Sequence, residues 1–175
     1  MAKGKTVISE LSISIDRDVF LRSLLRELSG TLEEVVGLDE AAGFVSIVGQ
    51  HIGEWMDSEY RKAMNTAQLD LQQVSDVLVD LKKRIEGGFY IESMDQDKIV
   101  LGNTHCPFGD KVLQRPSLCM MTSNVFGTVS AENLGYACVC LDKTIANGDG
   151  ECKVTIYLKQ DNTGGVGHGR EYFKS

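Results

Sequence analysis

The sequence predicts an α+β fold, an antiparallel sheet of two hairpins packed against several helices. Three observations predict it. Apolar residues recur at helical spacing through the first half of the chain, two pairs of strand-like segments follow, and another helical segment separates the pairs. Helices that are segregated from an antiparallel sheet define this class. With 175 residues, 42% of them hydrophobic, the chain is long enough for one domain with its own core.

The first helix is expected to begin near Val19, after an N-cap at Asp16 or Asp18, and to end at Gly37. Residues 1–15 before it are expected to form a mobile lead-in with a short strand. The large apolar residues of this helix recur at helical spacing and form one stripe: Phe20, Leu21, Leu24, Leu25, Leu28 and Leu32.

Two more helices are expected over residues 39–64 and 70–85, and Gly87 and Gly88 stop the second of them. Each is expected to turn its large apolar residues towards a core. In the helix over residues 39–64 these are Phe44, Ile47, Val48, Ile52, Trp55 and Met56. In the helix over residues 70–85 they are Leu71, Val74, Val77, Leu78 and Leu81.

The second half of the chain has the pattern of two hairpins around one helix. Strands are expected at 89–91 and 98–101 and again at 136–141 and 153–158. Pro116 can occupy the first turn of a helix that runs to about Asn133, with Gly135 ending it. Residues 16–160 are therefore expected to form a single domain, and residues 161–175, which are rich in glycine, a flexible tail.

Charge and hydropathy restrict the class of protein. The net charge of −7 argues against direct binding of nucleic acid, which favours a basic patch. The chain contains no run of about 18 apolar residues that would predict a membrane span, and its first residues lack an apolar secretory core. We therefore expect a cytoplasmic protein. In that reducing compartment an odd number of cysteines favours metal or redox chemistry over a disulfide framework.

All five cysteines lie between Cys106 and Cys152, and three of them lie in loops or at the ends of predicted elements. Cys106 follows a strand, Cys119 lies near the start of a helix, and Cys152 begins the last strand. A helix N-terminus favours the thiolate, which is the form that binds soft metals and iron–sulfur clusters. These positions predict a thiol site that holds zinc or an iron–sulfur cluster, or that responds to redox state.

Cys138 and Cys140 are two residues apart on a predicted strand, so both are expected on one face, taken here as the face that the helices cover. Either of them, or His105, is a candidate for a fourth ligand. Packing is the more common role of cysteine on an apolar strand. The chain has no Cys-x-x-Cys pair, so its spacing is not that of a zinc ribbon or a ferredoxin.

Two other hypotheses for the function remain open. The first is a module that binds a small hydrophobic ligand in a pocket between helices and sheet, with structural cysteines. Its lining would include Phe44, Trp55, Phe89, Phe108 and Phe126. The second is an enzyme with a nucleophilic cysteine, which needs a base beside the thiolate. Only His105 adjoins a cysteine in sequence, so the enzyme is the least favoured of the three hypotheses and no enzymatic activity is expected.

Residues 101–110 (LGNTHCPFGD) and 115–127 (RPSLCMMTSNVFG) resemble the methanogen output domain family, a relative of 4-vinyl-reductase-type sensory domains. Segments 16–28, 133–137 and 145–149 fit as well, so the resemblance covers most of residues 15–158. It implies a mixed α/β signalling module that dimerises, senses through cysteines or a small hydrophobic ligand, and acts on a signalling protein partner. The family motif corresponds to Cys106, Cys119 and Cys152 and does not extend to Cys138 or Cys140.

Overall fold

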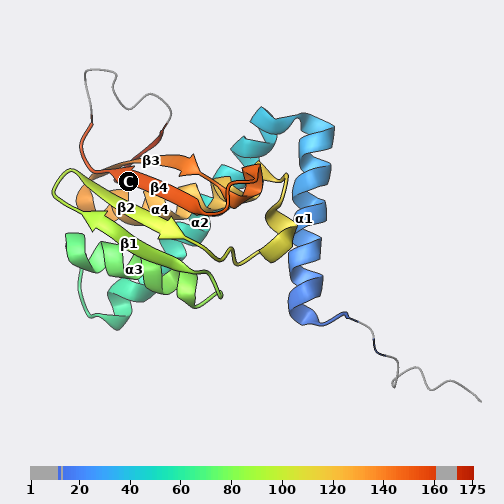
Figure 1. The fold of residues 1–175 in the computed structure, drawn as a ribbon. Coiled ribbons are helices and arrows are strands. Elements are labelled where there is room, and N and C mark those ends of the chain that lie inside the picture. The colour runs from blue at the N-terminus through green and yellow to red at the C-terminus, as the bar shows by residue number, and fades with distance from the viewer. Residues whose placement is uncertain (1–11, 13, 161–168) are drawn as a thin grey trace, which may run out of the picture.

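The computed structural model describes residues 12, 14–160 and 169–175. In these residues an antiparallel sheet with the strand order β1-β2-β4-β3-β5 packs against helices (Figure 1). The hairpins β1–β2 and β3–β4 lie side by side through the pairing of β2 with β4, and β5 adds to the free edge of β3. The α+β prediction and its two hairpins are therefore confirmed.

The helix α1 (Arg17–Val36) begins and ends close to the predicted residues. The carboxylate of Asp16 accepts a hydrogen bond from the Val19 backbone N–H, and Gly37 follows the last turn with a φ of 85°. Its apolar stripe, however, is not buried: Phe20 is 58% exposed and Leu28 is 59% exposed. Figure 1 shows α1 standing apart from the sheet at the edge of the molecule. The stripe therefore remains open to a partner.

The helix α2 (Leu38–Ala63) buries only part of the face that was predicted. Ile52 and Met56 pack against the main core, but Phe44 and Trp55 are more than half exposed, and Ile47 and Val48 are exposed as well. The buried face carries mostly small residues: Ala41, Val45, Ser46, Gly49, Gly53 and Asp57. A Cβ atom at Gly49 would lie 2.5 Å from the Asn124 Cβ of α4, so the glycines allow the two backbones to approach closely. Close helix contact, rather than side-chain size, selects this face.

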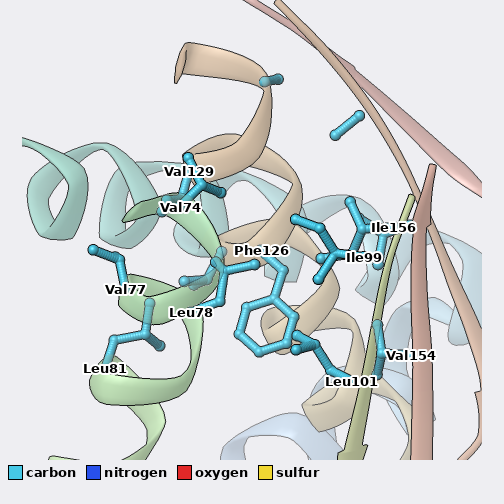
Figure 2. Close-up of a cluster of buried hydrophobic side chains, with 14 of the residues drawn as sticks. Val74, Val77, Leu78, Leu81, Ile99, Leu101, Phe126, Val129, Val154 and Ile156 are labelled. Atoms are coloured by element: carbon cyan, nitrogen blue, oxygen red, sulfur yellow. The ribbon is translucent and has the colours of Figure 1, made fainter. Parts of the chain in front are cut away.

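The helices α3 (Leu71–Lys83) and α4 (Pro116–Leu134) contribute to the main core together with the sheet. Asp70 and Gln73 form a capping box at the start of α3, and Pro116 occupies the first turn of α4 as predicted. In the core the fully buried ring of Phe126 lies between Leu78 of α3 and Leu101 of β2 (Figure 2). The predicted apolar face of α3 is thus the one that packs.

The sheet strands are β1 (Phe89–Met94), β2 (Lys98–Asn103), β3 (Tyr136–Lys143), β4 (Cys152–Tyr157) and β5 (Arg170–Phe173). Short 3₁₀ turns, η2 (Gly109–Val112) and η3 (Ile145–Asn147), precede α4 and β4. The expectation of a tail over residues 161–175 is wrong for its last part, because β5 pairs with β3 and places Tyr172 against Gly127 of α4. Residues 161–168, which include His168, lie outside the described residues. Most of the segment before Asp16, where a short strand was expected, also lies outside them.

None of the helices in the described part of the chain combines enough residues with enough apolar character to cross a bilayer.

Candidate functional site

Cys106, Cys119 and Cys152 line one pocket, although up to 46 residues separate them in the sequence. Cys106 lies in the loop after β2, Cys119 in the first turns of α4, and Cys152 at the start of β4. The pocket lies between the main core and a smaller apolar cluster that includes Val112 and Leu118. Its other walls are mostly apolar and include Phe89, Phe108, Leu141 and Val154.

The pocket is small. Its free volume is about 30 Å³, which accommodates two or three water-sized groups, since one water needs roughly 10–15 Å³ of such volume. An apolar cavity that binds benzene has about 150 Å³. In this conformation the pocket therefore has room for an ion with a water and not for an aromatic ligand.

Hydrogen bonds hold Cys152 and the loop of Cys106 in place. The buried amide of Asn103 donates from Nδ2 to the Cys152 Sγ at 3.7 Å, and its Oδ1 accepts from the backbone N–H groups of Gly88 and His105, each at 3.1 Å. The Ile145 backbone N–H donates to the Cys152 Sγ at 3.4 Å. These two donors fix the position of the Cys152 sulfur at the start of β4.

Burial controls the protonation of the other two thiols. Burial, with smaller contributions from the neighbouring thiols of Cys152 and Cys106, raises the pKa of Cys119 to about 12. Burial also raises the pKa of Cys106, while the backbone N–H groups of Phe108 and Gly109 partly oppose this increase. Both groups are therefore neutral thiols at physiological pH unless a cation displaces their protons.

Lys82 of α3 extends to the same region, and the sequence analysis missed it. The residue is 5% exposed, and its Nζ donates to Thr122 Oγ1 at 2.8 Å. The rings of Phe89 and Phe126 lie 5.7 and 5.2 Å from the ammonium, measured to their centroids. Burial lowers the pKa of Lys82 to about 8, and the charges of all three cysteines oppose that shift. Its position four residues after Leu78, on the apolar stripe of α3, was the available signal.

Cys138 and Cys140 do not join this pocket. Ala137 and Val139, which alternate with them on β3, pack into the main core, so the two thiols lie on the opposite face of the sheet. The assumption that they lie on the helix-covered face is therefore wrong. The backbone of Gly169 covers them, and a Cβ atom there would collide with both sulfur atoms. His105 is exposed and lines a shallow groove outside the thiol pocket.

The aromatic residues of the alternative ligand pocket are also not brought together. Phe89 and Phe108 line the thiol pocket, whereas Phe126 is buried in the main core. Phe44 and Trp55 lie exposed on α2. Trp55 instead lines an open, mainly apolar groove of about 410 Å³ together with Met56, Leu81 and Ile85.

The three converging thiols do not form a finished metal centre. Within residues 12, 14–160 and 169–175, no three His, Cys, Asp or Glu side chains are arranged so that they already enclose a metal ion. The residue types nevertheless suit a soft metal, because three thiols from a loop, a helix and a strand line one small pocket.

The fold and this thiol pocket define an α+β domain in which three of the five cysteines line one pocket beside the core. The family model described as methanogen output domain 1 matches residues 24–157, a range that includes all five cysteines. The chain therefore belongs to the methanogen output domain 1 family. No curated protein matches it in sequence.

Solved structures of other proteins share the fold at low sequence identity. A trafficking protein particle complex subunit 3 from Naegleria fowleri, covalently bound to palmitic acid, matches with a TM-score of 0.56 and 12% identity, over 81% of this chain and 96% of that one. The phenol-responsive sensory domain of the transcription activator PoxR, with phenol, matches with a TM-score of 0.59 and 13% identity, over 87% of this chain and 83% of that one. An Fe(II) unliganded H-NOX protein mutant from K. algicida matches with a TM-score of 0.55 and 15% identity, over 91% of this chain and 83% of that one.

Proposed function

We propose that this chain is a sensory and regulatory domain that receives its signal at the thiol pocket, where Cys106, Cys119 and Cys152 bind one soft metal ion. The observation that carries the proposal is the convergence of three distant thiols on one small pocket. Membership of an output-domain family and the likeness in fold to the sensory domain of PoxR support a regulatory task. The proposal assigns the chain no enzymatic activity.

A single ion fits the pocket better than an iron–sulfur cluster. A cluster of several iron and sulfide atoms requires more than the free volume of about 30 Å³. A zinc ion with three thiolates requires only that the thiol side chains reorient around one centre, with a fourth ligand from solvent or a signal molecule. When bound, the metal would supply a crosslink between the loop, the helix and the strand, and this crosslink would change with metal supply or thiol oxidation.

The loop that carries Cys106 also holds α1, which offers a route for the signal. Arg26 of α1 donates from Nη1 to the carbonyl of Lys111 at 2.6 Å and to that of Leu113 at 2.9 Å. Arg22 approaches Gly109, whose N–H donates to the carbonyl of Cys106. A change in the position of Cys106 is thereby linked through η2 to α1 and to its exposed apolar stripe.

The test is metal analysis of protein purified without oxygen. We expect about one zinc ion per chain and no visible absorption band. Each of the variants Cys106→Ser, Cys119→Ser and Cys152→Ser should lose most of this zinc. The matched controls Cys138→Ser and Cys140→Ser alter thiols on the other face of the sheet and should retain it. A brown sample with stoichiometric iron and sulfide would show that the pocket binds an iron–sulfur cluster and not a single ion. Equal metal content in all five variants would exclude the thiol site.

A second candidate function is the binding of a small hydrophobic molecule. Two proteins that share this fold carry palmitic acid and phenol, and the groove beside Trp55 has about 410 Å³ of space. The thiol pocket itself is too small for such a ligand in this conformation. Native mass spectrometry that detects a co-purified organic molecule and no metal would favour this candidate. Loss of that molecule in Trp55→Ala would place it in the groove.

The partner surface of the proposed sensor is the apolar face of α1 and α2, and we propose that a second copy of the chain covers it. Large apolar residues remain exposed on both helices, and exposed apolar surface of this kind marks interaction sites. They include Phe20, Leu24, Leu28, Val35, Phe44, Ile47 and Trp55. Light scattering should give a dimer for the wild type and a monomer for Leu28→Glu. The control Tyr90→Glu, on the edge strand β1, should stay dimeric, and a wild-type monomer would exclude the dimer.

A further inference from the structure

Lys82 has no carboxylate partner among the residues that the structure describes. Its side chain is almost fully buried, yet none of the ion pairs in the described ranges includes it. Its contacts with Thr122 and with the rings of Phe89 and Phe126 are to neutral groups. A buried cation without a counterion is costly to the folded state, which makes this lysine unusual in a core position.

The groups near Lys82 that can carry negative charge are the thiols of the pocket. Thiolates at Cys106, Cys119 or Cys152 would each favour the charged ammonium, and Thr122 and Phe89 belong both to the pocket wall and to the surroundings of Lys82. The lysine and the thiols therefore act on one another across a region that excludes most water, where charges interact strongly.

The charge of Lys82 favours the metal-loaded state of the thiol pocket. While the three thiols are protonated, the charge of Lys82 is unbalanced. Three thiolates around a divalent ion carry one net negative charge, and Lys82 balances it. The pocket with protonated thiols thus contains an unbalanced cation, and the metal-loaded pocket is neutral as a whole.

We propose that Lys82 is the buried countercharge of the thiol pocket and favours a divalent metal ion held by three thiolates. This inference rests on the proposed function of the same pocket. Lys82 touches no metal in this scheme: it acts through the charge of the thiolates, and Thr122 together with the two phenyl rings holds its ammonium in place.

The test compares Lys82→Met, which keeps the length of the side chain and removes the charge, with Lys83→Met. Lys83 is the next residue and is exposed, so it serves as the matched control. Each reduced protein is titrated with Co²⁺ without oxygen at one fixed pH, and the thiolate-to-cobalt absorption band reports binding. We expect the affinity of Lys82→Met to fall 10-fold to 100-fold, the range typical of groups that support metal ligands. Lys83→Met should bind as the wild type does, and Lys82→Arg, which keeps the charge, should recover most of the affinity.

Thermal unfolding of the metal-free proteins separates this role from a structural one. If Lys82 is a countercharge, Lys82→Met should be at least as stable as the wild type without metal, because an unbalanced buried cation has been removed. If Lys82 only supports the fold, the variant should lose stability and keep its cobalt affinity, which would overturn the inference. Lys82→Gln, which retains a donor for Thr122, replaces the methionine variant if that one does not fold. Failure of both to fold would also overturn the inference.

The outcomes also distinguish the inference from the proposed function. A wild type that shows no thiolate-to-cobalt band overturns both. A wild type that binds cobalt, together with a Lys82→Met variant of equal affinity, leaves the thiol site intact and overturns the role of Lys82 alone.

Discussion

The side-chain amide of Asn133 donates a hydrogen bond of 2.6 Å to the carboxylate of Asp57, and both residues are almost fully buried. Asn133 lies at the end of α4 and Asp57 in the second half of α2. The Asn133 Oδ1 also accepts from the Leu69 backbone N–H at 2.8 Å, and Arg61 pairs with Asp57 at 2.7 Å. This network joins α2, α4 and the start of α3 at the opposite end of the fold from α1.

The first prediction concerns this network. Asp57→Ala should lower the free energy of unfolding by about 2–4 kcal/mol, because the amide of Asn133 loses its buried acceptor and Arg61 loses its counterion. Glu59→Ala, an exposed position on the same helix, should change it by less than about 0.5 kcal/mol. Urea unfolding followed by circular dichroism measures both values. Equal effects of the two substitutions would show that the Asp57 network adds nothing to stability.

The second prediction tests the close contact of α2 with α4. Gly49→Ala should destabilise the protein by at least about 2 kcal/mol, because the added Cβ would lie 2.5 Å from the Asn124 Cβ. Gly43→Ala, on the same helix, meets no atom within 4 Å and should stabilise it by about 0.5–1 kcal/mol through helix propensity. Thermal unfolding would reveal opposite signs for the two variants. A stabilised Gly49→Ala would mean that the helices lie further apart.

The sequence predicted the elements better than their faces. Caps and breakers are local signals, so Asp16, Asp70, Pro116 and Gly135 placed the ends of helices within a few residues. The face of α2 was predicted only in part, because all the large apolar residues were assumed to be buried, whereas glycines at positions 49 and 53 set the approach of α4. Each glycine meets a residue 75 positions further along the sequence, and no local pattern reveals such a contact.

The candidate site was predicted in part for a similar reason. The positions of Cys106, Cys119 and Cys152 at element ends indicated convergence, and the structure gathers all three in one pocket. Strand alternation correctly put Cys138 and Cys140 on one face, but only the neighbouring core residues show which face that is. Lys82 lies on the apolar stripe of α3, but a long lysine side chain there can also extend to solvent. Only the docking of α3 against α4 shows that its ammonium is buried.

The third prediction concerns thiol reactivity. In reduced, metal-free protein at pH 8, Cys119 should react with iodoacetamide at least about 100-fold more slowly than the same residue in urea. Burial raises the pKa of the Cys119 thiol to about 12, so almost none of it is thiolate at that pH. Peptide mass spectrometry after timed labelling measures the two rates. A native rate close to the unfolded one would contradict the buried position of Cys119 in the pocket.

The fourth prediction concerns β5 and its dependence on pH. Burial raises the pKa of the Tyr172 phenol to about 12, although the Ser123 hydroxyl opposes this, and the phenol lies 3.1 Å from both Ser123 Oγ and Asn124 Oδ1. The unfolded chain releases this proton near pH 10, whereas the native protein retains it to about pH 12. The stabilisation is therefore complete below pH 10 and is lost as the pH rises from about 10 to 12.

Tyr172→Phe removes this dependence. At pH 8 the variant should be less stable than the wild type by about 1–2 kcal/mol, because the Asn124 carbonyl loses a donor. The difference should shrink as the pH rises above 10, since only the wild type then releases a proton on unfolding at that position. Tyr90→Phe, on the exposed edge of the sheet, is the control and should follow the wild type up to pH 9. If the loss of stability in Tyr172→Phe stayed constant from pH 8 to 11, the phenol would be solvated and β5 would not bury it against α4.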